Sequence, residues 1–465
     1  MNDNNNLSVS KQSISRRELQ KLVQTQLKML LEVNNLEGAK TVLVPVLPVD
    51  IADAIEGLPK AMQAIAFRLL SKDEAIEVYE HLEPKVQQLL IEDFKRQDVL
   101  DIMDKMSPDD RAKLFEELPA KVVRRLLAQL SHEERENTAL LLGYKPNTAG
   151  RIMTPEYISL KEGWTVDRAL ERARRLAPTT ETIYSLYVTD AVHRLSGYVS
   201  LRNLVIAKPE QTIGEIMDRN LVCVHTDTDR EEAARLLQRY DFLAIPVVDA
   251  EKRLVGIITV DDAIDILHEE TSKDIHIHGG VQSGGDRYFH SPFYSIIRRR
   301  ALWLIVVFII SCLASVIIQA QEKVLEQAII LAVFIPLLMD TGGDVGSQSS
   351  TVVIRGLNTR EIDSHKALWA IRREAIAGAL LGLMLGVVAI VWSYFLQGDL
   401  LIALVVGLTL LVISVLSTIV GTALPFLFSF LGLDPALMSA PFITTIADVL
   451  GVLVYFYIAK LILNL

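Results

Sequence analysis

The distribution of apolar residues divides the chain into two parts with different patterns. Five long apolar segments fill the C-terminal part, at about 301–319, 324–354, 374–396, 400–430 and 436–463. Each can form a helix that spans the hydrocarbon core of a bilayer, which takes about 20 residues. Before residue 300 the apolar positions are short and periodic, as in soluble domains. The pattern therefore predicts a multidomain protein whose last part, residues 301–465, is an all-α transmembrane domain of five helices.

A twelve-residue repeat dominates the first soluble domain, which we place at residues 1–145. Apolar residues recur at this interval: Leu58, Leu70, Leu82, Phe94, Met106, Leu118 and Leu130. Most are followed within two residues by a proline or serine, and the pairs Ser71/Glu74 and Ser131/Glu134 have capping-box spacing. This pattern predicts an acidic α-superhelix of short helices that bury one face against their neighbours.

Residues 146–270 change to short apolar strands between helical stretches, and this region is internally duplicated. Ile152-Met153-Thr154-Pro155 recurs as Ile216-Met217-Asp218-Arg219, and the segment 194–200 recurs as 253–259. Each copy resembles a cystathionine-β-synthase (CBS) domain, and two copies imply the usual paired α/β module. Such pairs often bind adenosyl ligands through an acid after the last strand. The second copy has Asp261 and Asp262 there and the first has Asn203, so ATP or another adenine nucleotide is a candidate ligand.

Residues 271–300 connect the soluble domains to the first span. Two glycine pairs, Gly279-Gly280 and Gly284-Gly285, predict a flexible linker. Ser291-Pro292 then has the pattern of an N-cap followed by proline in the first helical turn. We expect a connecting helix from this point through Arg300 towards the membrane.

The fifth apolar segment contains a carboxylate, Asp448, within the stretch from Pro441 to Gly451. A carboxylate near the middle of a span costs about 3 kcal/mol on insertion scales. The only cation in the same segment is Lys460, about 18 Å further along a helix and too distant to pair. Asp448 is therefore protonated, meets water, holds a cation, or is tolerated through a hydrogen bond to Thr444 or Thr445. Its position favours an ion site.

The second apolar segment is interrupted by small and polar residues between Pro336 and Gln348, including Asp340 and Asp344. Proline and glycine weaken a regular helix, so we expect broken helix here. Such a break is tolerated at membrane depth only where protein or a wet cavity covers it. Freed carbonyls and two carboxylates are hard oxygen ligands suited to Mg²⁺, Mn²⁺ or Ca²⁺.

These two stretches together resemble the MgtE family of magnesium channels. The resemblance covers essentially the whole chain and implies a homodimer with a Mg²⁺ pore along the subunit interface. Its motif residues are Gly342, Gly343, Asp344, Gly346, Gln348, Pro441, Thr444 and Thr445, with Asp448 facing the ion. The family commonly has Asn at the position of Asp344. This departure predicts either altered selectivity or a position outside the pore.

Acidic residues also gather at the end of the second CBS copy, where Asp262, Asp265 and Glu269 share one helix face. A solvated surface accounts for such a pattern equally well. The MgtE resemblance implies instead that regulatory Mg²⁺ binds acids from this region and neighbouring domains: Asp262, Asp265, Glu270, Asp274, Asp434, Asp241, Glu231, Asp109 and Asp110. Lys273 stands where the family would favour an acid, which predicts a weaker or missing site.

Basic residues predict the orientation in the membrane. Arg298, Arg299 and Arg300 precede the first span, and a further group lies between the second and third: Arg355, Arg360, Lys366, Arg372 and Arg373. The positive-inside rule places both groups in the cytoplasm. We expect a multi-pass protein of the cell (inner) membrane with cytoplasmic N-terminal domains and the C-terminus outside.

Composition excludes several other classes. The first 300 residues hold 47 Asp+Glu and 40 Lys+Arg, and this acidic balance argues against nucleic-acid binding. There is no His-Glu-x-x-His motif and all nine histidines lie outside the apolar segments, so an intramembrane metalloprotease is excluded and no enzyme is expected. Cys223 and Cys312 have no metal or redox spacing. Two alternatives remain: a transporter of another divalent cation such as Co²⁺ or Mn²⁺, or a CBS-based membrane sensor of nucleotides or ions.

Overall fold

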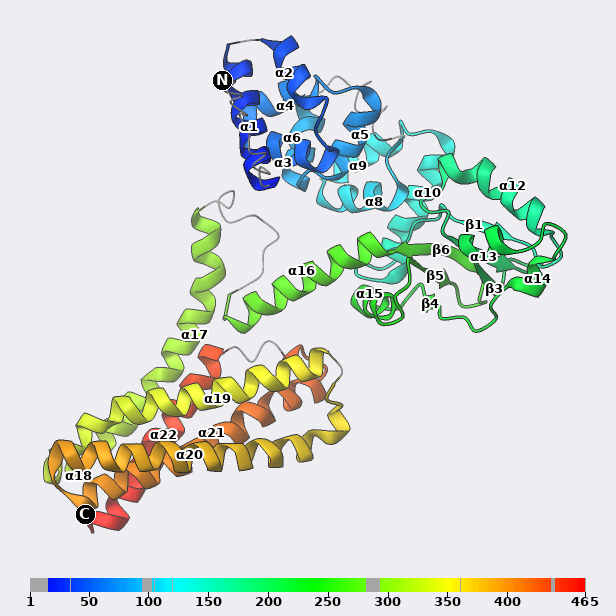
Figure 1. Cartoon of the computed structure of the whole chain (residues 1–465). Coiled ribbons are helices and arrows are strands. Elements are labelled where there is room, and N and C mark those ends of the chain that lie inside the picture. Colours follow the sequence, from blue (N-terminus) through cyan, green and yellow to red (C-terminus); the bar gives the residue numbers. More distant parts are fainter. Residues whose placement is uncertain are drawn as a thin grey trace, which may run out of the picture. The chain divides into compact units, whose positions relative to one another are not determined.

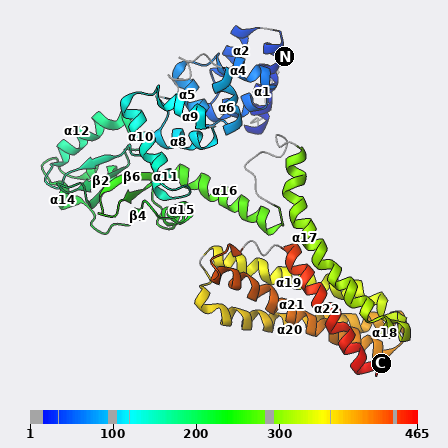
Figure 2. The same ribbon diagram turned by 180° about the vertical axis from the view of Figure 1, so that it is seen from behind.

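The chain folds into two compact units, Met1–Leu267 and His268–Leu465. The computed structural model describes residues 16–33, 35–93, 103, 105–118, 120–281, 293–359, 361–435 and 440–464. Figure 1 shows these elements along the chain, and Figure 2 shows them from behind.

The first unit begins with short helices. After α1 (Arg16–Glu32) and α2 (Leu36–Leu43), they are α3 (Pro48–Glu56), α4 (Lys60–Phe67), α5 (Lys72–Glu80), α6 (Pro84–Asp93), α8 (Pro108–Glu117), α9 (Ala120–Leu127) and α10 (His132–Gly143). From α3 onwards their first residues keep the twelve-residue interval predicted from the repeat. Most repeat positions lie in one core, among them Leu58, Leu82, Met106, Leu118 and Leu130, while Phe94 lies outside the described residues. The predicted helical stack is confirmed.

Two of these helices have the side-chain N-caps that the capping-box spacing predicted. The Ser71 hydroxyl accepts a hydrogen bond from the backbone N–H of Glu74, and the Glu74 carboxylate accepts one from the N–H of Ser71. Ser131 caps α10 in the same way, but the carboxylate of Glu134 pairs with Arg111. Arg111 is fully buried, so this ion pair fixes α8 against α10.

The CBS region contains, in the described part of the chain, two three-stranded sheets of the same topology. The first is β1 (Ile158–Leu160), β2 (Ser185–Thr189) and β3 (Leu195–Ser200), and the second is β4 (Val224–His225), β5 (Ala244–Val248) and β6 (Leu254–Thr259). In each sheet the first pair is parallel and the second antiparallel, with a register shift near the end of the middle strand. The accompanying helices are α11 (Ala149–Ile152), α12 (Val166–Leu176), η1 (Ala177–Thr179), α13 (Leu201–Ile206), α14 (Ile213–Ile216) and α15 (Arg230–Arg239).

The two CBS copies pack against each other through a pair of reciprocal contacts, each between a methionine of one copy and a glycine of the other. Met153 of the first copy packs on Gly256 of the second, where a β-carbon would lie 2.6 Å from its sulfur. Met217 of the second copy packs on Gly197 of the first, with a corresponding distance of 2.4 Å. A side chain at Gly256 would also press on the backbone carbonyl oxygen of Thr154, 2.9 Å away, whereas one at Gly197 would require the Met217 side chain to move. The internal repeat predicted from sequence is a paired module.

The second unit contains the apolar helices. Helix α16 (Val260–His278) leads into it, and the following elements are α17 (Phe293–Ala320), α18 (Glu322–Gln327), η2 (Ile329–Phe334), α19 (Ile335–Asn358), η3 (Ser364–Lys366), α20 (Ala367–Gln397), α21 (Leu400–Phe430) and α22 (Ala440–Leu463). Among the described residues, five helices are long and apolar enough to cross a membrane, as predicted. The linker glycines 284 and 285, Ser291, Pro292 and the predicted start of the fifth span at 436–439 lie outside the described residues.

The expectation of broken helix between Pro336 and Gln348 is wrong. Helix α19 is continuous through this stretch, with Pro336 in its first turn, where the missing N–H costs nothing. Its glycines allow close packing between membrane helices, as small residues do in lipid. A β-carbon on Gly342 would lie 2.5 Å from Ile413 of α21, and one on Gly343 would lie 3.1 Å from Thr444 of α22. The irregular backbone comes earlier, in the 3-10 helix η2.

Candidate ion site

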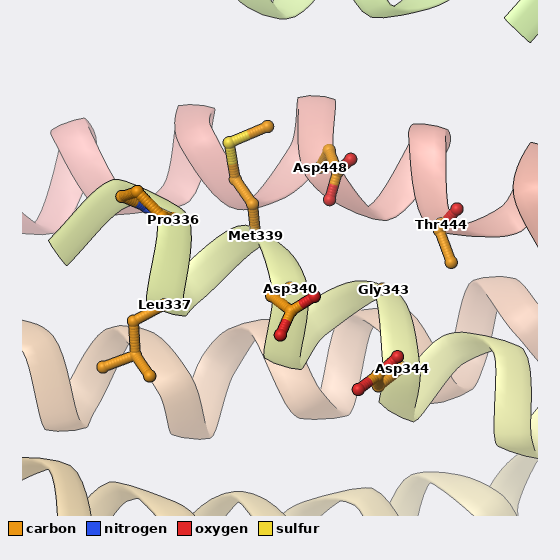
Figure 3. A pocket seen from close by; sticks show the side chains of 8 residues that line it. All are labelled: Pro336, Leu337, Met339, Asp340, Gly343, Asp344, Thr444 and Asp448. Atoms are coloured by element: carbon orange, nitrogen blue, oxygen red, sulfur yellow. The ribbon is translucent and has the colours of Figure 1, made fainter.

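A pocket of about 640 Å³ lies between α19 and α22 and contains three carboxylates (Figure 3). Asp340 and Asp344 project into it from α19, and Asp448 projects from α22. The remaining lining residues are Pro336, Leu337, Met339, Gly343 and Thr444. The sequence assigned Asp448 to an ion site and left the place of Asp344 open. Here Asp344 lines the same pocket as Asp448.

The helix spacing arranges these side chains in two layers. On α19 Asp340 precedes Asp344 by one turn, and on α22 Thr444 precedes Asp448 by one turn. Asp448 lies across from the part of α19 that carries Met339 and Asp340, whereas Thr444 packs on Gly343, next to Asp344 (Figure 3). Four residues rise about 6 Å along a helix. The pocket thus has a layer with Asp340 and Asp448, followed by a layer with Asp344 and Thr444.

The neighbouring threonines donate no hydrogen bond to the Asp448 carboxylate. The hydroxyls of Thr444 and Thr445 both donate to the carbonyl oxygen of Pro441, at 3.0 and 2.7 Å. Each hydroxyl has a single proton, so neither donates to the carboxylate. Three carboxylates between membrane-length apolar helices can attract a hydrated divalent cation and supply it with oxygen ligands.

The other motif residues shape the pocket without lining it. Gly342 and Gly346 are buried and face α21, where Gly421 lies against the Gly346 carbonyl. Gln348 is exposed, one turn beyond Asp344, and Thr445 is buried. The sequence indicated Asp340 and Asp344 as oxygen ligands of this segment, but Asp340 was not among the pore-motif residues. Its spacing of four from Asp344 on a helix was the signal that could have placed it on the same face.

A second acidic group lies in the first unit, where α8 meets the start of α16. Asp109 and Asp110 belong to the first turn of α8, and Asp261 and Asp262 to the first turn of α16. Burial raises the pKa of Asp262 to about 6, and the charge of Asp110 adds to the effect. Burial, together with the charges of Asp262 and Asp110, raises the pKa of Asp109 well above its usual range. Asp109 and Asp262 were both predicted from sequence, and the structure brings them together.

Three glutamates adjoin this group and were not predicted. Burial raises the pKa of Glu181 to about 7, with further contributions from Asp262 and Asp261. Burial and the charge of Asp110 raise the pKa of Glu80 to about 7. The pKa of Glu156 is also raised to about 7, first by burial and then by Glu134. These glutamates are far apart in the sequence, so only the fold reveals them.

The donor set of this acidic cluster fits a hard divalent cation. The Oδ1 atom of Asp109 is buried and accepts no hydrogen bond from any described residue. An unsatisfied buried carboxylate oxygen beside further carboxylates is chemically suited to Mg²⁺. Within the described part of the chain, however, no three His, Cys, Asp or Glu side chains already converge as a finished metal site.

The remaining predicted regulatory residues have other surroundings. Glu231 pairs with Arg235 on α15, with Oε1 2.9 Å from Nε, and Asp241 is exposed at a turn of positive φ. Asp265 is exposed on α16. Asp274 accepts a hydrogen bond of 2.7 Å from Asn358 at the end of α19. Glu270 is buried, and its Oε2 lies 2.9 Å from the Lys273 ammonium.

A cleft in the CBS pair is lined by aromatic and polar side chains. Tyr187, Tyr198 and Phe242 are joined there by Asp218 and Asn220, and by Leu221, Val222, Ala244 and Pro246. One Asp218 carboxylate oxygen accepts the backbone N–H of Asn220 at 2.8 Å. Flat apolar surfaces with a few polar groups are typical of sites for small organic ligands. The sequence candidates for nucleotide binding, Asp261 and Asp262 of the second copy and Asn203 of the first, are not among these lining residues.

The helical stack, the CBS pair and five membrane-length apolar helices, two of which line a pocket with three carboxylates, define a class, that of multi-pass membrane transporters for cations. Family models agree: a divalent cation transporter model (MgtE) matches residues 335–458, the MgtE intracellular N domain matches 47–147, and CBS domains match 149–210 and 213–269. The chain belongs to the MgtE family. It is a transporter by family and not an enzyme.

Relatives match over nearly the full length. The chain is 38% identical over 442 residues to the magnesium transporter MgtE of Thermus thermophilus, covering 94% of this chain and 98% of that protein. It is 33% identical over 435 residues to the Bacillus subtilis magnesium transporter MgtE, covering 93% and 95%. A crystal structure of the cytosolic domain of the Mg²⁺ channel MgtE with ATP is similar at 37% identity and a TM-score of 0.51, covering 52% of this chain and 99% of that one.

Proposed function

We propose that the chain conducts Mg²⁺ across the membrane through the pocket between α19 and α22. The observation that carries this proposal is the position of Asp448 opposite Asp340 and Asp344 between apolar helices. The relatives named as magnesium transporters support Mg²⁺ as the ion. Mg²⁺ gives up its water reluctantly, so a pocket of this volume suits an ion that keeps part of its hydration shell.

Ion flux through the purified protein in liposomes tests this function. Mg²⁺ uptake driven by a membrane potential is expected, with slower uptake of Ca²⁺. Faster uptake of Co²⁺ or Mn²⁺ than of Mg²⁺ would favour the alternative of another divalent substrate. Absence of any divalent flux would contradict transport and favour a sensor.

We propose further that two copies of the chain form the conducting unit. The carboxylates of Asp340 and Asp344 are exposed in the single chain, on a pocket that is open on one side. A second copy related by a two-fold axis would close the pocket and place six carboxylates around one path. Chemical cross-linking in the membrane, followed by mass determination, tests this assembly.

The basic residues support an orientation with the soluble domains in the cytoplasm. Arg300 near the start of the first span and Arg355, Lys366, Arg372 and Arg373 between the second and third lie at the same end of the apolar helices by chain order. The C-terminus then lies outside, and the membrane is the cell membrane. Accessibility of single introduced cysteines to an impermeant reagent tests each loop.

We propose that cytosolic Mg²⁺ closes the path by binding the acidic cluster of Asp109, Asp110, Asp261 and Asp262. Without a cation these carboxylates repel one another, and burial, followed by the charge of Asp110, raises the pKa of Asp262 to about 6. An ion that binds them only in the compact arrangement shifts the population towards it. Near-complete closing requires about 5 kcal/mol of preferential binding, which several ions together can supply.

We also propose that the CBS cleft of Tyr187, Tyr198 and Phe242 binds an adenine nucleotide. A similar cytosolic domain has been crystallised with ATP, and the aromatic lining suits a purine ring. Binding of labelled ATP to the purified protein tests this. Phe242→Ala should weaken it at least tenfold, whereas Tyr184→Ala, an exposed tyrosine outside the cleft, should not. Equal binding by both variants would contradict this site.

A further inference from the structure

Lys273 contacts the carboxylate of Glu270 in the second unit and is influenced by the charges of Asp274 and Asp434. Its ammonium lies 2.9 Å from Oε2 of Glu270, which is 8% exposed. The hydrogen bond to Glu270 raises the pKa of Lys273, and the charges of Glu270, Asp434 and Asp274 raise it further. Two of these acids belong to α16, and Asp434 lies between α21 and α22. Lys273 therefore interacts electrostatically with acids of α16 and with Asp434 of the segment between α21 and α22.

The same segment of α16 is attached to the membrane helix α19. Asn358 at the end of α19 donates to the Asp274 carboxylate at 2.7 Å, and the His278 ring lies 3.0 Å from the hydroxyl of Thr351. The three acids thus lie where α16 meets the ends of the pore-forming helices. A charge at this position therefore affects how α16 is held against the membrane helices.

These residues do not fit a divalent cation as the structure has them. Glu270, Asp274 and Asp434 are a plausible oxygen donor set for Mg²⁺. However, the ammonium already lies at hydrogen-bond distance from the buried carboxylate. A metal ion bound to the same oxygens would stand a few ångströms from a positive charge, where repulsion in a partly buried site is strong. Metal binding would require the Lys273 side chain to leave.

We propose that Lys273 is a tethered cation that takes the place of a regulatory metal ion at this position. This inference rests on the proposed gating by Mg²⁺. The ammonium joins α16 to the segment between α21 and α22 at every Mg²⁺ concentration, because it cannot dissociate from the protein. Control by cytosolic Mg²⁺ then falls to the acidic cluster of Asp109 and Asp262. The chain accordingly binds one ion fewer than a chain with an acid at this position.

Two measurements on the full-length protein test the proposal, each with Lys273→Glu, Lys273→Met and Lys273→Arg. The first is the number of Mg²⁺ ions bound per chain at equilibrium, and the second is the steepness of channel inhibition by cytosolic Mg²⁺. Lys273→Glu should bind about one more ion per chain and show steeper inhibition. Lys273→Arg should match the parent protein. Lys273→Met removes the ammonium from the three acids without adding a fourth, so it should bind the additional ion more weakly than Lys273→Glu and be inhibited only at several-fold higher Mg²⁺ than the parent protein.

Lys121→Glu is a matched control, because it adds the same charge change at an exposed lysine of the helical domain. It should leave ion number and steepness unchanged. The proposal is overturned if Lys273→Glu binds no additional ion, or if Lys273→Met is inhibited like the parent. Ion counting does not depend on flux, so a protein that fails to transport Mg²⁺ would contradict the proposed function while leaving this test intact.

Discussion

The carbonyl oxygen of Gly346 lies against Gly421, so closely that a β-carbon on Gly421 would be 2.2 Å from it. This contact joins α19 to α21 behind the carboxylate pocket. Van der Waals packing is a main source of helix association in lipid, because the acyl chains are as apolar as the side chains. The contact therefore determines the position of the pocket-bearing helix.

Gly421→Ala should lower the unfolding temperature of the membrane domain, because backbone must move to admit the methyl group. Overpacking of this kind costs about 1–3 kcal/mol. Gly451→Ala is the matched control, since its β-carbon would meet Ile413 at an ordinary 3.4 Å. Thermal unfolding of both variants in detergent gives the comparison, and equal midpoints would show that the close approach is unimportant.

Asp448→Ala should abolish divalent uptake at unchanged expression and folding, because the carboxylate contributes ion attraction and little packing. Asp448→Asn should keep the shape of the pocket and lose most selectivity for divalent over monovalent ions. Uptake into liposomes and size-exclusion profiles are the measurements. An Ala variant that transports like the parent would remove Asp448 from the ion path.

Asp344→Asn should retain Mg²⁺ transport and change the order of preference among Mg²⁺, Co²⁺, Mn²⁺ and Ca²⁺. Asp340→Asn should weaken ion attraction more strongly, because Asp340 shares its layer of the pocket with Asp448 (Figure 3). We expect a several-fold higher half-saturating Mg²⁺ concentration. Val352→Leu, at an exposed position of α19 outside the lining, is the control. Unchanged selectivity and affinity in both aspartate variants would place them outside the path.

Combined Asp262→Ala and Asp265→Ala should leave conduction intact and weaken inhibition by cytosolic Mg²⁺ about tenfold. It should also remove any protection by Mg²⁺ of the 275–290 segment from protease. Patch recordings and limited proteolysis provide the two readouts. Normal inhibition in the double variant would exclude this cluster as the sensor.

The acidic cluster should make stability depend on pH in the absence of divalent ions. Burial raises the pKa of Glu181 to about 7 and that of Asp262 to about 6. The folded protein then binds more protons than the unfolded chain from roughly pH 4 to 7, so stability falls as pH rises through this range. Thermal unfolding in EDTA should show this decline, and Mg²⁺ should reverse it most strongly above pH 7.

A variant with Glu181→Gln and Asp262→Asn isolates this contribution. Its unfolding temperature should depend less on pH than that of the parent protein and should respond less to Mg²⁺. Parallel curves for parent and variant across pH 5 to 8 would contradict the assignment of the pH dependence to these carboxyls.

Periodic features were predictable from the sequence. The twelve-residue repeat placed the helices that start at Pro48, Lys60 and Lys72, because a short helix with one buried face leaves a regular apolar position. The duplicated CBS segments and the five spans followed from similar local patterns. Asp448 was identifiable because a carboxylate in an apolar helix costs free energy, so it marks a functional site.

Features that depend on contacts between distant segments were not predictable. The glycines of α19 suggested a broken helix, because glycine has a low intrinsic helix propensity. In the structure they allow α19 to pack closely against Ile413 and Thr444 of the neighbouring helices. Glu181 joins the acidic cluster only through the fold. Lys273 was visible as a departure from the family pattern, but its hydrogen bond to Glu270 was not.

The reciprocal packing of Met153 on Gly256 and Met217 on Gly197 has a consequence for biosynthesis. Thr154 forms its backbone bridge with Ile257, about a hundred residues later in the chain. At a translation rate of roughly 5–20 residues per second, Met153 and Thr154 wait about 5–20 s for strand β6 of the second copy, on which they pack. During that interval the Met153 side chain lacks this partner, and it offers a binding surface for chaperones. Translation pauses between codons 160 and 250 should therefore reduce the yield of folded protein more than pauses after codon 260.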